Sequence, residues 1–289
     1  MKIIEKIQMR RPFYSLEFFP PKERENWPVF FSTVETLRSL DPLFVSVTYG
    51  AGGGTRDYTL EITGHIAELG LTPMAHLTCV GATKQSISEY LHKLRASGVT
   101  NILALRGDVP QGQSICWSDC EFSYASDLVR YVHEGYPDFG IGAAAYLTPH
   151  PESGSFAADR KAAVFKLEQG SDFAVTQLFF DHREYFEYVA QMRAAGVQKP
   201  ILPGVLPIPS FATLRRVLAL SGCNIPAKLY LALEEADRQG GAEAVKEAGI
   251  AFAVQQIRRL LDGGAPGIHL YTLNKADTCL RIVQEVGAL

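Results

Sequence analysis

Two carboxylates, Glu17 and Asp108, are the residues in this sequence whose surroundings best suit acid–base chemistry. Glu17 lies among aromatic and proline residues in the segment 16–21, and burial of that kind raises the pKa of a carboxyl group toward the range of a general acid. A carboxylate held by a backbone cap or by Arg106 is the structural alternative. Asp108 follows Arg106 and Gly107, so the neighbouring guanidinium would partly balance its charge and leave it ionised. Two carboxylates in different environments suit one proton donor and one group whose charge adjusts the local electrostatic potential.

Further polar residues follow or close apolar stretches, where each would be costly unless it were hydrogen-bonded or faced a ligand. They are Thr48, His76, Arg106, Tyr146, Gln177, Tyr271 and Asn274. A single such residue is as easily structural as functional. If the stretches are strands that converge on one mouth, a shared pocket explains the whole set.

Apolar, β-rich runs alternate with segments of helical periodicity along the whole chain. The predicted strands are 14–19, 44–48, 74–78, 101–105, 141–146, 173–177, 201–206 and 267–270. The predicted helices are 29–40, 58–69, 86–97, 124–134, 159–169, 183–195, 211–220, 227–236 and 242–261. Eight strand–helix units without a linker predict an α/β protein with a (β/α)8 TIM-barrel fold, in which residues 1–289 form a single domain.

A doubly wound open sheet is the competing fold, but a glycine fingerprint is missing after the first strand. The glycine cluster at 50–55 lacks the Lys-Ser/Thr of a phosphate loop, so we interpret it as a flexible turn. In a TIM barrel the active site is built at the carboxyl ends of the strands, which is where the polar residues above fall.

Composition excludes several classes of protein. With 47% hydrophobic residues and a formal net charge of −3, the 289 residues can bury a large core and have no electrostatic reason to bind nucleic acid or an anionic membrane. Charges interrupt the N-terminal apolar residues, and no run is long enough to span a membrane, which predicts a cytoplasmic protein. The five scattered cysteines predict free thiols, including the close pair Cys116 and Cys120.

Motifs for other chemistry are missing. No nucleophile elbow supports covalent hydrolysis. His76, His150 and Glu152 lack the spacing of a metal site, so we expect no metal.

The sequence resembles the methylenetetrahydrofolate reductases, which are flavin-dependent barrel enzymes of one-carbon metabolism. The resemblance rests on seven motifs in family order, at 16–22, 44–51, 75–79, 103–108, 174–181, 201–204 and 270–274. It implies bound FAD that NADH or NADPH reduces, after which the folate takes the hydride at the same face. It also implies a homo-oligomer, either a dimer or a tetramer, and the absence of the regulatory domain of eukaryotic relatives.

The resemblance also implies roles for individual residues. Glu17 would be the general acid that opens the imidazolidine ring of 5,10-methylenetetrahydrofolate, and Asp108 the carboxylate near the flavin and the pterin. Substrate contacts would come from Gln177, Phe211, Tyr271 and Lys275. Flavin contacts would come from Thr48, His76, Arg106, Gly107, Asp108, Tyr124, Ala125, Ser126, Ala144, Tyr146, His150, Asp159 and Lys166, with Lys166 suited to the pyrophosphate.

Three departures from the family pattern bear on cofactor use. Ala162 and Phe165 stand where flavin-binding relatives commonly have Asn and Arg, the segment 146–152 changes its inner residues, and 116–120 is an insertion. Three alternatives therefore stay open. They are direct hydride transfer from NAD(P)H without FAD, a folate-binding barrel that transfers or carries a methyl group without redox chemistry, and a catalytically silent assembly subunit.

Overall fold

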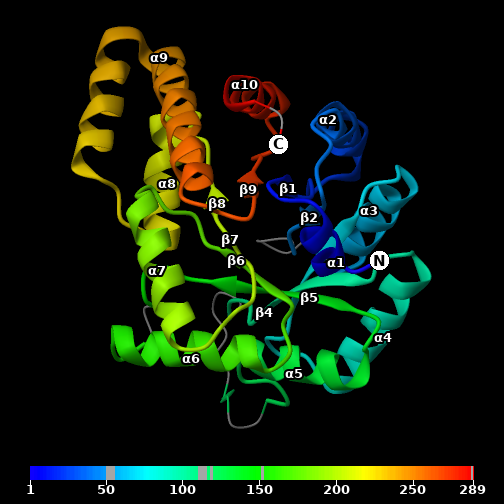
Figure 1. The fold of residues 1–289 in the computed structure, drawn as a ribbon. Coiled ribbons are helices and arrows are strands. Elements are labelled where there is room, and N and C mark those ends of the chain that lie inside the picture. Colours follow the sequence, from blue (N-terminus) through cyan, green and yellow to red (C-terminus); the bar gives the residue numbers. More distant parts are fainter. Residues whose placement is uncertain (50–55, 110–115, 118–119, 151–152, 288) are drawn as a thin grey trace.

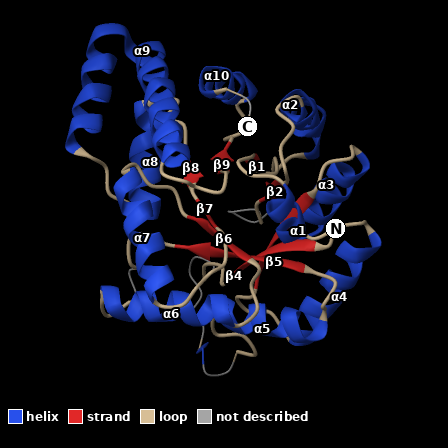
Figure 2. Ribbon diagram, viewed as in Figure 1, coloured by secondary structure: helices blue, strands red, loops and turns tan. Residues whose placement is uncertain are grey.

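The fold was analysed in a computed structural model that describes residues 1–49, 56–109, 116–117, 120–150, 153–287 and 289. Parallel strands form the wall of a barrel, and helices cover its outside (Figure 1, Figure 2). The strands are β1 (Tyr14–Phe18), β2 (Val45–Val47), β3 (Pro73–Thr78), β4 (Asn101–Leu105), β5 (Gly140–Ala145), β6 (Phe173–Thr176), β7 (Ile201–Leu202), β8 (Gly204–Val205) and β9 (Ile268–Tyr271). They pair in the order β7-β6-β5-β4-β3-β2-β1-β9-β8. The predicted barrel fold is confirmed, and the predicted glycine turn at 50–55 lies outside the described residues.

Helices follow most of the strands, as the periodicity predicts. They are α1 (Ile3–Met9), α2 (Trp27–Arg38), α3 (Arg56–Glu68), α4 (Lys84–Ala96), α5 (Ala125–Gly135), α6 (Phe156–Glu168), α7 (His182–Ala194), α8 (Phe211–Ser221), α9 (Ala227–Asp262) and α10 (Ala276–Val286), with the short 3-10 helix η1 (Arg24–Asn26) before α2. The two helices predicted at 227–236 and 242–261 run together as α9, which kinks at Gly241 with a φ of 61°. Helix α6 begins at Phe156 rather than at the predicted Asp159, because Ser155 caps it by accepting a hydrogen bond from the Ala158 amide.

One predicted strand, 201–206, is divided into β7 and β8 by Pro203. Proline has no N–H to give to a neighbouring strand, so the ladder is interrupted there. Strand β7 pairs with β6 and β8 pairs with β9, while the Pro203 carbonyl accepts a hydrogen bond from the His269 amide at 3.0 Å. The two short strands together occupy the seventh position of the barrel, between β6 and β9.

Helix α1, which the sequence analysis did not predict, closes the amino-terminal end of the barrel. Its two buried residues, Ile3 and Ile7, lie in a cluster with residues of the barrel interior such as Phe44 and Phe173. The Ile3 amide also donates to the Asn101 side chain at 2.9 Å. Since this end is filled with hydrocarbon, the polar side chains can meet only at the opposite, carboxyl end.

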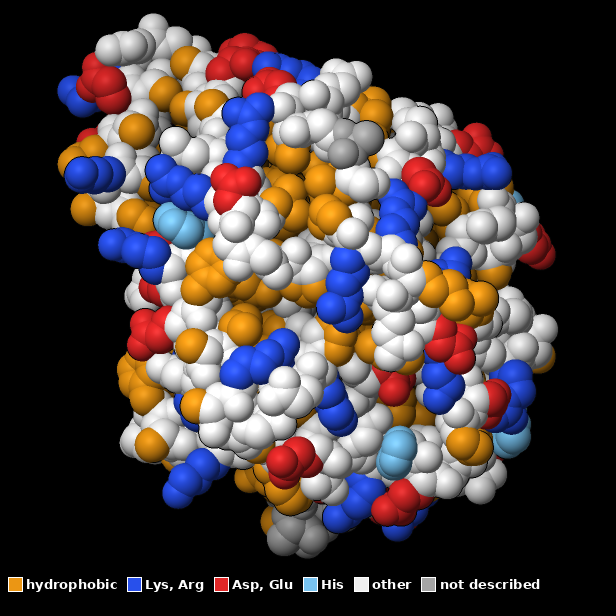
Figure 3. All heavy atoms as spheres, viewed as in Figure 1, with side chains coloured by type: hydrophobic (Ala, Val, Ile, Leu, Met, Phe, Trp, Pro, Cys, Tyr) orange, Lys and Arg blue, Asp and Glu red, His pale blue; other side chains and the backbone are white. Residues whose placement is uncertain are grey.

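The surface agrees with the near-neutral composition. On the face shown in Figure 3, basic and acidic side chains are both scattered rather than gathered by sign. Over the described ranges, no helix is long and apolar enough to cross a membrane. All five cysteines are free thiols, as predicted.

Candidate functional site at the carboxyl ends of the strands

Glu17 lies at the carboxyl end of β1, next to Ser46 of β2 on one side and Tyr271 of β9 on the other. Its carbonyl oxygen accepts hydrogen bonds from the backbone amide and the hydroxyl of Thr272, at 3.1 and 2.6 Å. Two residues further along, the Asn274 side chain makes two hydrogen bonds to Phe19: its amide nitrogen donates to the Phe19 carbonyl at 2.7 Å and its oxygen accepts from the Phe19 amide at 3.1 Å. The backbone that carries Glu17 is therefore held in place by the last strand of the barrel.

The carboxylate of Glu17 is buried, with 5% of the residue exposed, and it contacts two imidazoles. His76 Nε2 of β3 and His269 Nε2 of β9 each lie 3.3 Å from Glu17 Oε2. The hydroxyl of Ser46 donates to the same oxygen, also at 3.3 Å. Three strands thus converge on one carboxylate oxygen.

The expected rise in the pKa of Glu17 is wrong. Burial does raise the pKa of this carboxyl, but the charge of His76 and the hydrogen bonds and charge of His269 and His76 outweigh burial and lower the pKa to about 2. The ion pairs described for Glu17 are with His76 and His269. An ionised carboxylate beside two imidazoles can act as an acid only if a proton reaches it from one of them or from the solvent.

Gly107 allows the loop after β4 to fold back onto β3. Its φ of 84° is in the left-handed region, and a Cβ there would lie 2.8 Å from Val80 and 2.9 Å from Thr78. The Arg106 carbonyl accepts hydrogen bonds from the amides of Cys79 and Val80, at 3.2 and 2.8 Å. This turn places Arg106 and Asp108 beside the mouth of the barrel.

Arg106 and Asp108 share Tyr146 as a neighbour. Burial raises the pKa of the Tyr146 phenol, the charge of Asp108 raises it further, and the charge of Arg106 opposes that effect. Asp108 is exposed, and the guanidinium of Arg106 lies 5.1 Å from the centre of the Trp117 ring. The structure therefore brings both predicted residues to the same side of the mouth.

Helix α6 supplies a second wall, around Asp159 and Lys166. Asp159 accepts a hydrogen bond from the His150 amide at 3.0 Å, and Lys166 Nζ donates to the Ala144 carbonyl at 2.5 Å. The ammonium group also lies 5.8 Å from the centre of the Tyr146 ring. Burial lowers the pKa of Lys166 to about 8, against the opposing effect of the Asp159 carboxylate.

The remaining predicted residues are more dispersed. Tyr271 is buried and donates its hydroxyl to the Thr176 carbonyl at 2.7 Å, and Gln177 accepts from the Leu178 amide at 3.0 Å. Phe211 is packed against Tyr230 in a separate apolar cluster between α8 and α9, so its ring is already covered. Of the other predicted contact residues, Thr48 and Ser126 are buried, Ala125 is half-buried, and Tyr124 and Lys275 are exposed.

Three residues that contact the site were not singled out from the sequence, namely Ser15, Ser46 and His269. Ser15 and Glu17 share one face of β1, as His269 and Tyr271 share one face of β9, because side chains alternate along a strand. A histidine inside an apolar strand, two residues before a predicted site tyrosine, was the signal that could have identified His269. Among the residues that the structure describes, no group of three or more His, Cys, Asp or Glu side chains is arranged to hold a metal ion.

Comparison with known proteins decides the family. The family profile described as methylenetetrahydrofolate reductase matches residues 2–287. The chain belongs to the methylenetetrahydrofolate reductase family. The 5,10-methylenetetrahydrofolate reductase of Salmonella typhimurium is 36% identical over 94% of this chain and 90% of the relative.

Longer members of the methylenetetrahydrofolate reductase family match as well. Methylenetetrahydrofolate reductase (NADH) 1 of Arabidopsis thaliana is 35% identical over the whole chain, which spans about half (51%) of that relative. A probable methylenetetrahydrofolate reductase (NADPH) of Caenorhabditis elegans is 34% identical over 97% of the chain and 43% of its own length.

Among solved structures, an uncharacterized protein from Clostridium thermocellum that binds two copies of 5-methyl-5,6,7,8-tetrahydrofolic acid has a TM-score of 0.67. It covers 98% of this chain and 99% of its own at 15% identity, a level that shows a shared fold.

The wall around Lys166 fits an anionic group such as the pyrophosphate of FAD. The Lys166 ammonium is withdrawn from solvent, donates a hydrogen bond to the Ala144 carbonyl and feels the charge of Asp159, and a phosphate would add further negative charge beside it. Arg106, whose charge also acts on Tyr146, is a second cation at the mouth. On α6 itself the positions of Ala162 and Phe165 are exposed and apolar, with Phe165 52% exposed, so neither adds a positive charge to this wall.

Proposed function

We propose that this chain reduces 5,10-methylenetetrahydrofolate to 5-methyltetrahydrofolate with NADH or NADPH, using FAD held at the barrel mouth. The observation that carries the proposal is Glu17, a buried carboxylate at the carboxyl end of a barrel strand with two imidazoles against one oxygen. Family membership supports the substrate, as does the methyltetrahydrofolate bound by the structurally similar Clostridium thermocellum protein. We also propose that residues 1–289 act as one catalytic domain.

In this mechanism the chain's own residues bind the reactants and move one proton. FAD, when bound, would supply the hydride-transfer chemistry between the nicotinamide and the folate. Lys166 and Arg106 would hold the cofactor by charge, with Asp159 orienting the α6 wall. Asp108, with its negative charge at the open side of the mouth, would stabilise the cationic iminium that forms when the imidazolidine ring opens. Glu17 would supply the proton for that ring opening.

The purified protein tests the proposal. We expect yellow protein that releases flavin on denaturation and oxidises NADH or NADPH only as methylenetetrahydrofolate is consumed. A colourless protein without turnover in the presence of added FAD would contradict it.

Direct hydride transfer from the nicotinamide to the folate is the second candidate, because α6 presents Ala162 and exposed Phe165 at positions where an arginine would help neutralise a pyrophosphate. Turnover by a preparation shown to be free of flavin would favour it. Turnover that appears only on adding FAD would favour the first proposal.

Removal of the Lys166 charge is expected to weaken FAD binding. We expect Lys166→Met to raise the dissociation constant of FAD by about tenfold or more, which is the contribution of one charge-assisted hydrogen bond. Because the pKa of Lys166 is about 8, affinity in the wild type should be highest below pH 8 and decline above it as the ammonium deprotonates, whereas the variant should lack that decline. Quenching of flavin fluorescence on binding measures both.

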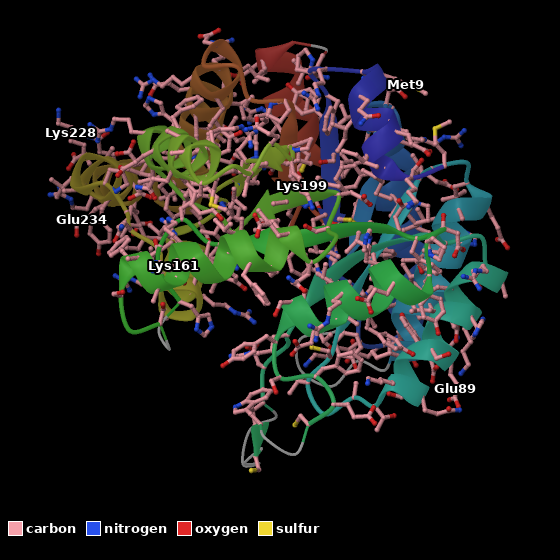
Figure 4. All side chains as sticks on the ribbon, turned by 60° about the horizontal axis from the view of Figure 1, so that its bottom comes forward. Met9, Glu89, Lys161, Lys199, Lys228 and Glu234 are labelled. Atoms are coloured by element: carbon pink, nitrogen blue, oxygen red, sulfur yellow. The ribbon has the colours of Figure 1, made fainter. Side chains whose placement is uncertain are left out.

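Lys161 supplies the matched control. It lies on the exposed side of the same helix (Figure 4), so Lys161→Met removes an equal charge without changing the mouth. Equal losses in the two variants would show that only the net charge of α6 matters and would contradict the assignment of Lys166.

A further inference from the structure

A chain of hydrogen bonds runs from Ser15 through His269 to Glu17, entirely inside the barrel. Ser15 Oγ lies 2.9 Å from His269 Nδ1, and His269 Nε2 lies 3.3 Å from Glu17 Oε2. The exposed fraction is 0% for both Ser15 and His269. The chain joins β1 and β9, whose register places Ser15 opposite His269.

The contacts of His269 accommodate a hydrogen on each ring nitrogen. A hydroxyl has one hydrogen to donate, and Ser15 Oγ lies 3.4 Å from the Ile268 carbonyl, which can only accept. With that hydrogen on the carbonyl, Oγ accepts from Nδ1–H. Nε2 faces the carboxylate of Glu17, so it also carries a hydrogen. An imidazolium, which carries a hydrogen on each nitrogen, then donates to both Ser15 and Glu17.

Phe44 and Glu17 flank the His269 ring. The ring is stacked on Phe44, with ring centres 5.7 Å apart and planes 18° apart, where a charged imidazole would gain a cation–π contact. The Glu17 carboxylate, whose pKa of about 2 keeps it ionised, would pair with that charge. A buried ion pair is stable only while its partners and the local dielectric favour separated charge.

We propose that His269, oriented by Ser15, is the proton store for Glu17. When a folate covers the mouth and removes water, the ion pair becomes less favourable than a neutral pair. The His269 Nε2–H bond then breaks and a Glu17 O–H bond forms, leaving neutral imidazole and carboxylic acid. The acid gives the same proton to the folate nitrogen as the ring opens. After product leaves, a proton from water returns to His269 through Glu17, which is the member of the pair at the mouth. This inference rests on the proposed function, whose net reaction takes up one proton per hydride transferred.

Other charged and titratable groups face Glu17 from neighbouring elements. His76 of β3 contacts the same oxygen and carries part of the charge balance, and Tyr271 of β9 lies close enough for its phenol to feel the carboxylate charge. The Tyr271 hydroxyl is committed to the Thr176 carbonyl, and its pKa is raised well above the ordinary value by burial first and then by Glu17. Among the described residues in contact with Glu17, His269 is the one whose second nitrogen is also held in a buried hydrogen bond.

The replacement His269→Gln separates a proton store from a structural contact. Glutamine keeps an N–H donor near Glu17 Oε2 but cannot release its hydrogen. We expect oxidation of NADH or NADPH without folate to stay within about twofold of wild type, and folate reduction at pH 7.5 to fall about 10- to 100-fold. We expect the loss to shrink as the pH is lowered, because the variant must take its proton from solution. A folded His269→Gln variant with the wild-type pH profile would overturn the proposal.

Two further variants keep the test decisive. His65→Gln is the control, since His65 lies on α3 with a side chain that is 44% exposed, and it should leave both reactions and their pH profiles unchanged. Ser15→Ala is the second test should His269→Gln fail to fold. It removes the partner of Nδ1, and we expect a smaller loss of about 3- to 10-fold confined to folate reduction. A uniform loss in both reactions would show a merely structural role and overturn the proposal.

Nitrogen-15 spectra of the histidine rings report the proton directly, without turnover. In the free wild-type protein we expect His269 to show two protonated nitrogens, and addition of 5-methyltetrahydrofolate should convert it to the neutral pattern; the His269→Gln spectrum assigns the signal. A neutral ring in the free protein overturns the proton store even if the enzyme is active. Failure of the proposed function would look different, because wild-type protein would then neither turn over nor respond to the folate.

Discussion

Glu17→Gln is expected to reduce folate reduction by about 10²- to 10⁴-fold while oxidation of NADH or NADPH in the absence of folate stays within about threefold of wild type. The reason is that ring opening needs a proton, whereas delivery of hydride from the nicotinamide does not. Glutamine is close in size to glutamate and can still contact Ser46 and the two imidazoles, so geometry changes little. Rapid-mixing measurements of the two half-reactions separate the effects.

Glu89→Gln is the matched control for this replacement. Glu89 lies on the exposed face of α4 (Figure 4), where it accepts a hydrogen bond from Gln85, and its amide variant should retain both activities. Equal losses in the two half-reactions of Glu17→Gln would count against a role for Glu17 as the proton donor.

The same variant reports the electrostatics of the buried cluster through stability. The pKa of Glu17 is about 2 in the folded protein against an ordinary value of 4.5, so its ionised form stabilises the fold above pH 4.5, and this contribution is lost as the pH falls through 2. Wild type should therefore exceed Glu17→Gln in unfolding free energy by up to about 3 kcal/mol near neutral pH. Urea unfolding from pH 7 to pH 3 should show this gap narrowing. A gap that is independent of pH would mean that the imidazoles do not set the pKa of Glu17.

Gly249→Ala is expected to lower the melting temperature by about 3–10 °C, even though alanine is the better helix former. Gly249 lies in the middle of α9, where a Cβ would be 2.0 Å from the Ile208 carbonyl oxygen. A backbone carbonyl cannot rotate aside as a side chain can, so α9 would have to move away from β8 and the segment that follows it. Differential scanning calorimetry measures the change.

Gly135→Ala is the control for that substitution. Gly135 ends α5, nothing lies within 4 Å of a Cβ built there, and its backbone is not in the left-handed region. Its replacement should leave the melting temperature unchanged or raise it slightly. If both variants behave alike, the close approach of α9 to Ile208 does not contribute to stability.

The strands and most helices could be predicted because their signals are local. Strand β4 coincides with the predicted range 101–105, and α9 kinks at Gly241 between its two predicted segments. Helices α1 and α10 were missed. With seven residues, α1 is too short to be stable by itself and forms because Ile3 and Ile7 fill the end of the barrel, which no local pattern reveals. Helix α10 does carry a local pattern, with Cys279, Ile282 and Val283 buried on one face, and that signal was overlooked.

The sequence predicted which residues form the site better than it predicted their charge states. Arg106, Asp108, Tyr146 and Lys166 do lie around one mouth, as residues at strand ends of a barrel must. Phe211 does not lie open at the mouth, because its ring packs against Tyr230 in the cluster between α8 and α9. Its position at the start of a helix did not reveal that contact.

The sequence by itself determined the barrel, the family and the presence of Glu17 at a strand end, since apolar runs, helix periodicity and short motifs depend on neighbours in the chain. The tertiary structure alone decided the charge state of Glu17. Its partner His269 is 252 positions away and reaches it only because the last strand closes against the first. A pKa depends on distances between charges and on exclusion of water, and closure of the barrel sets both.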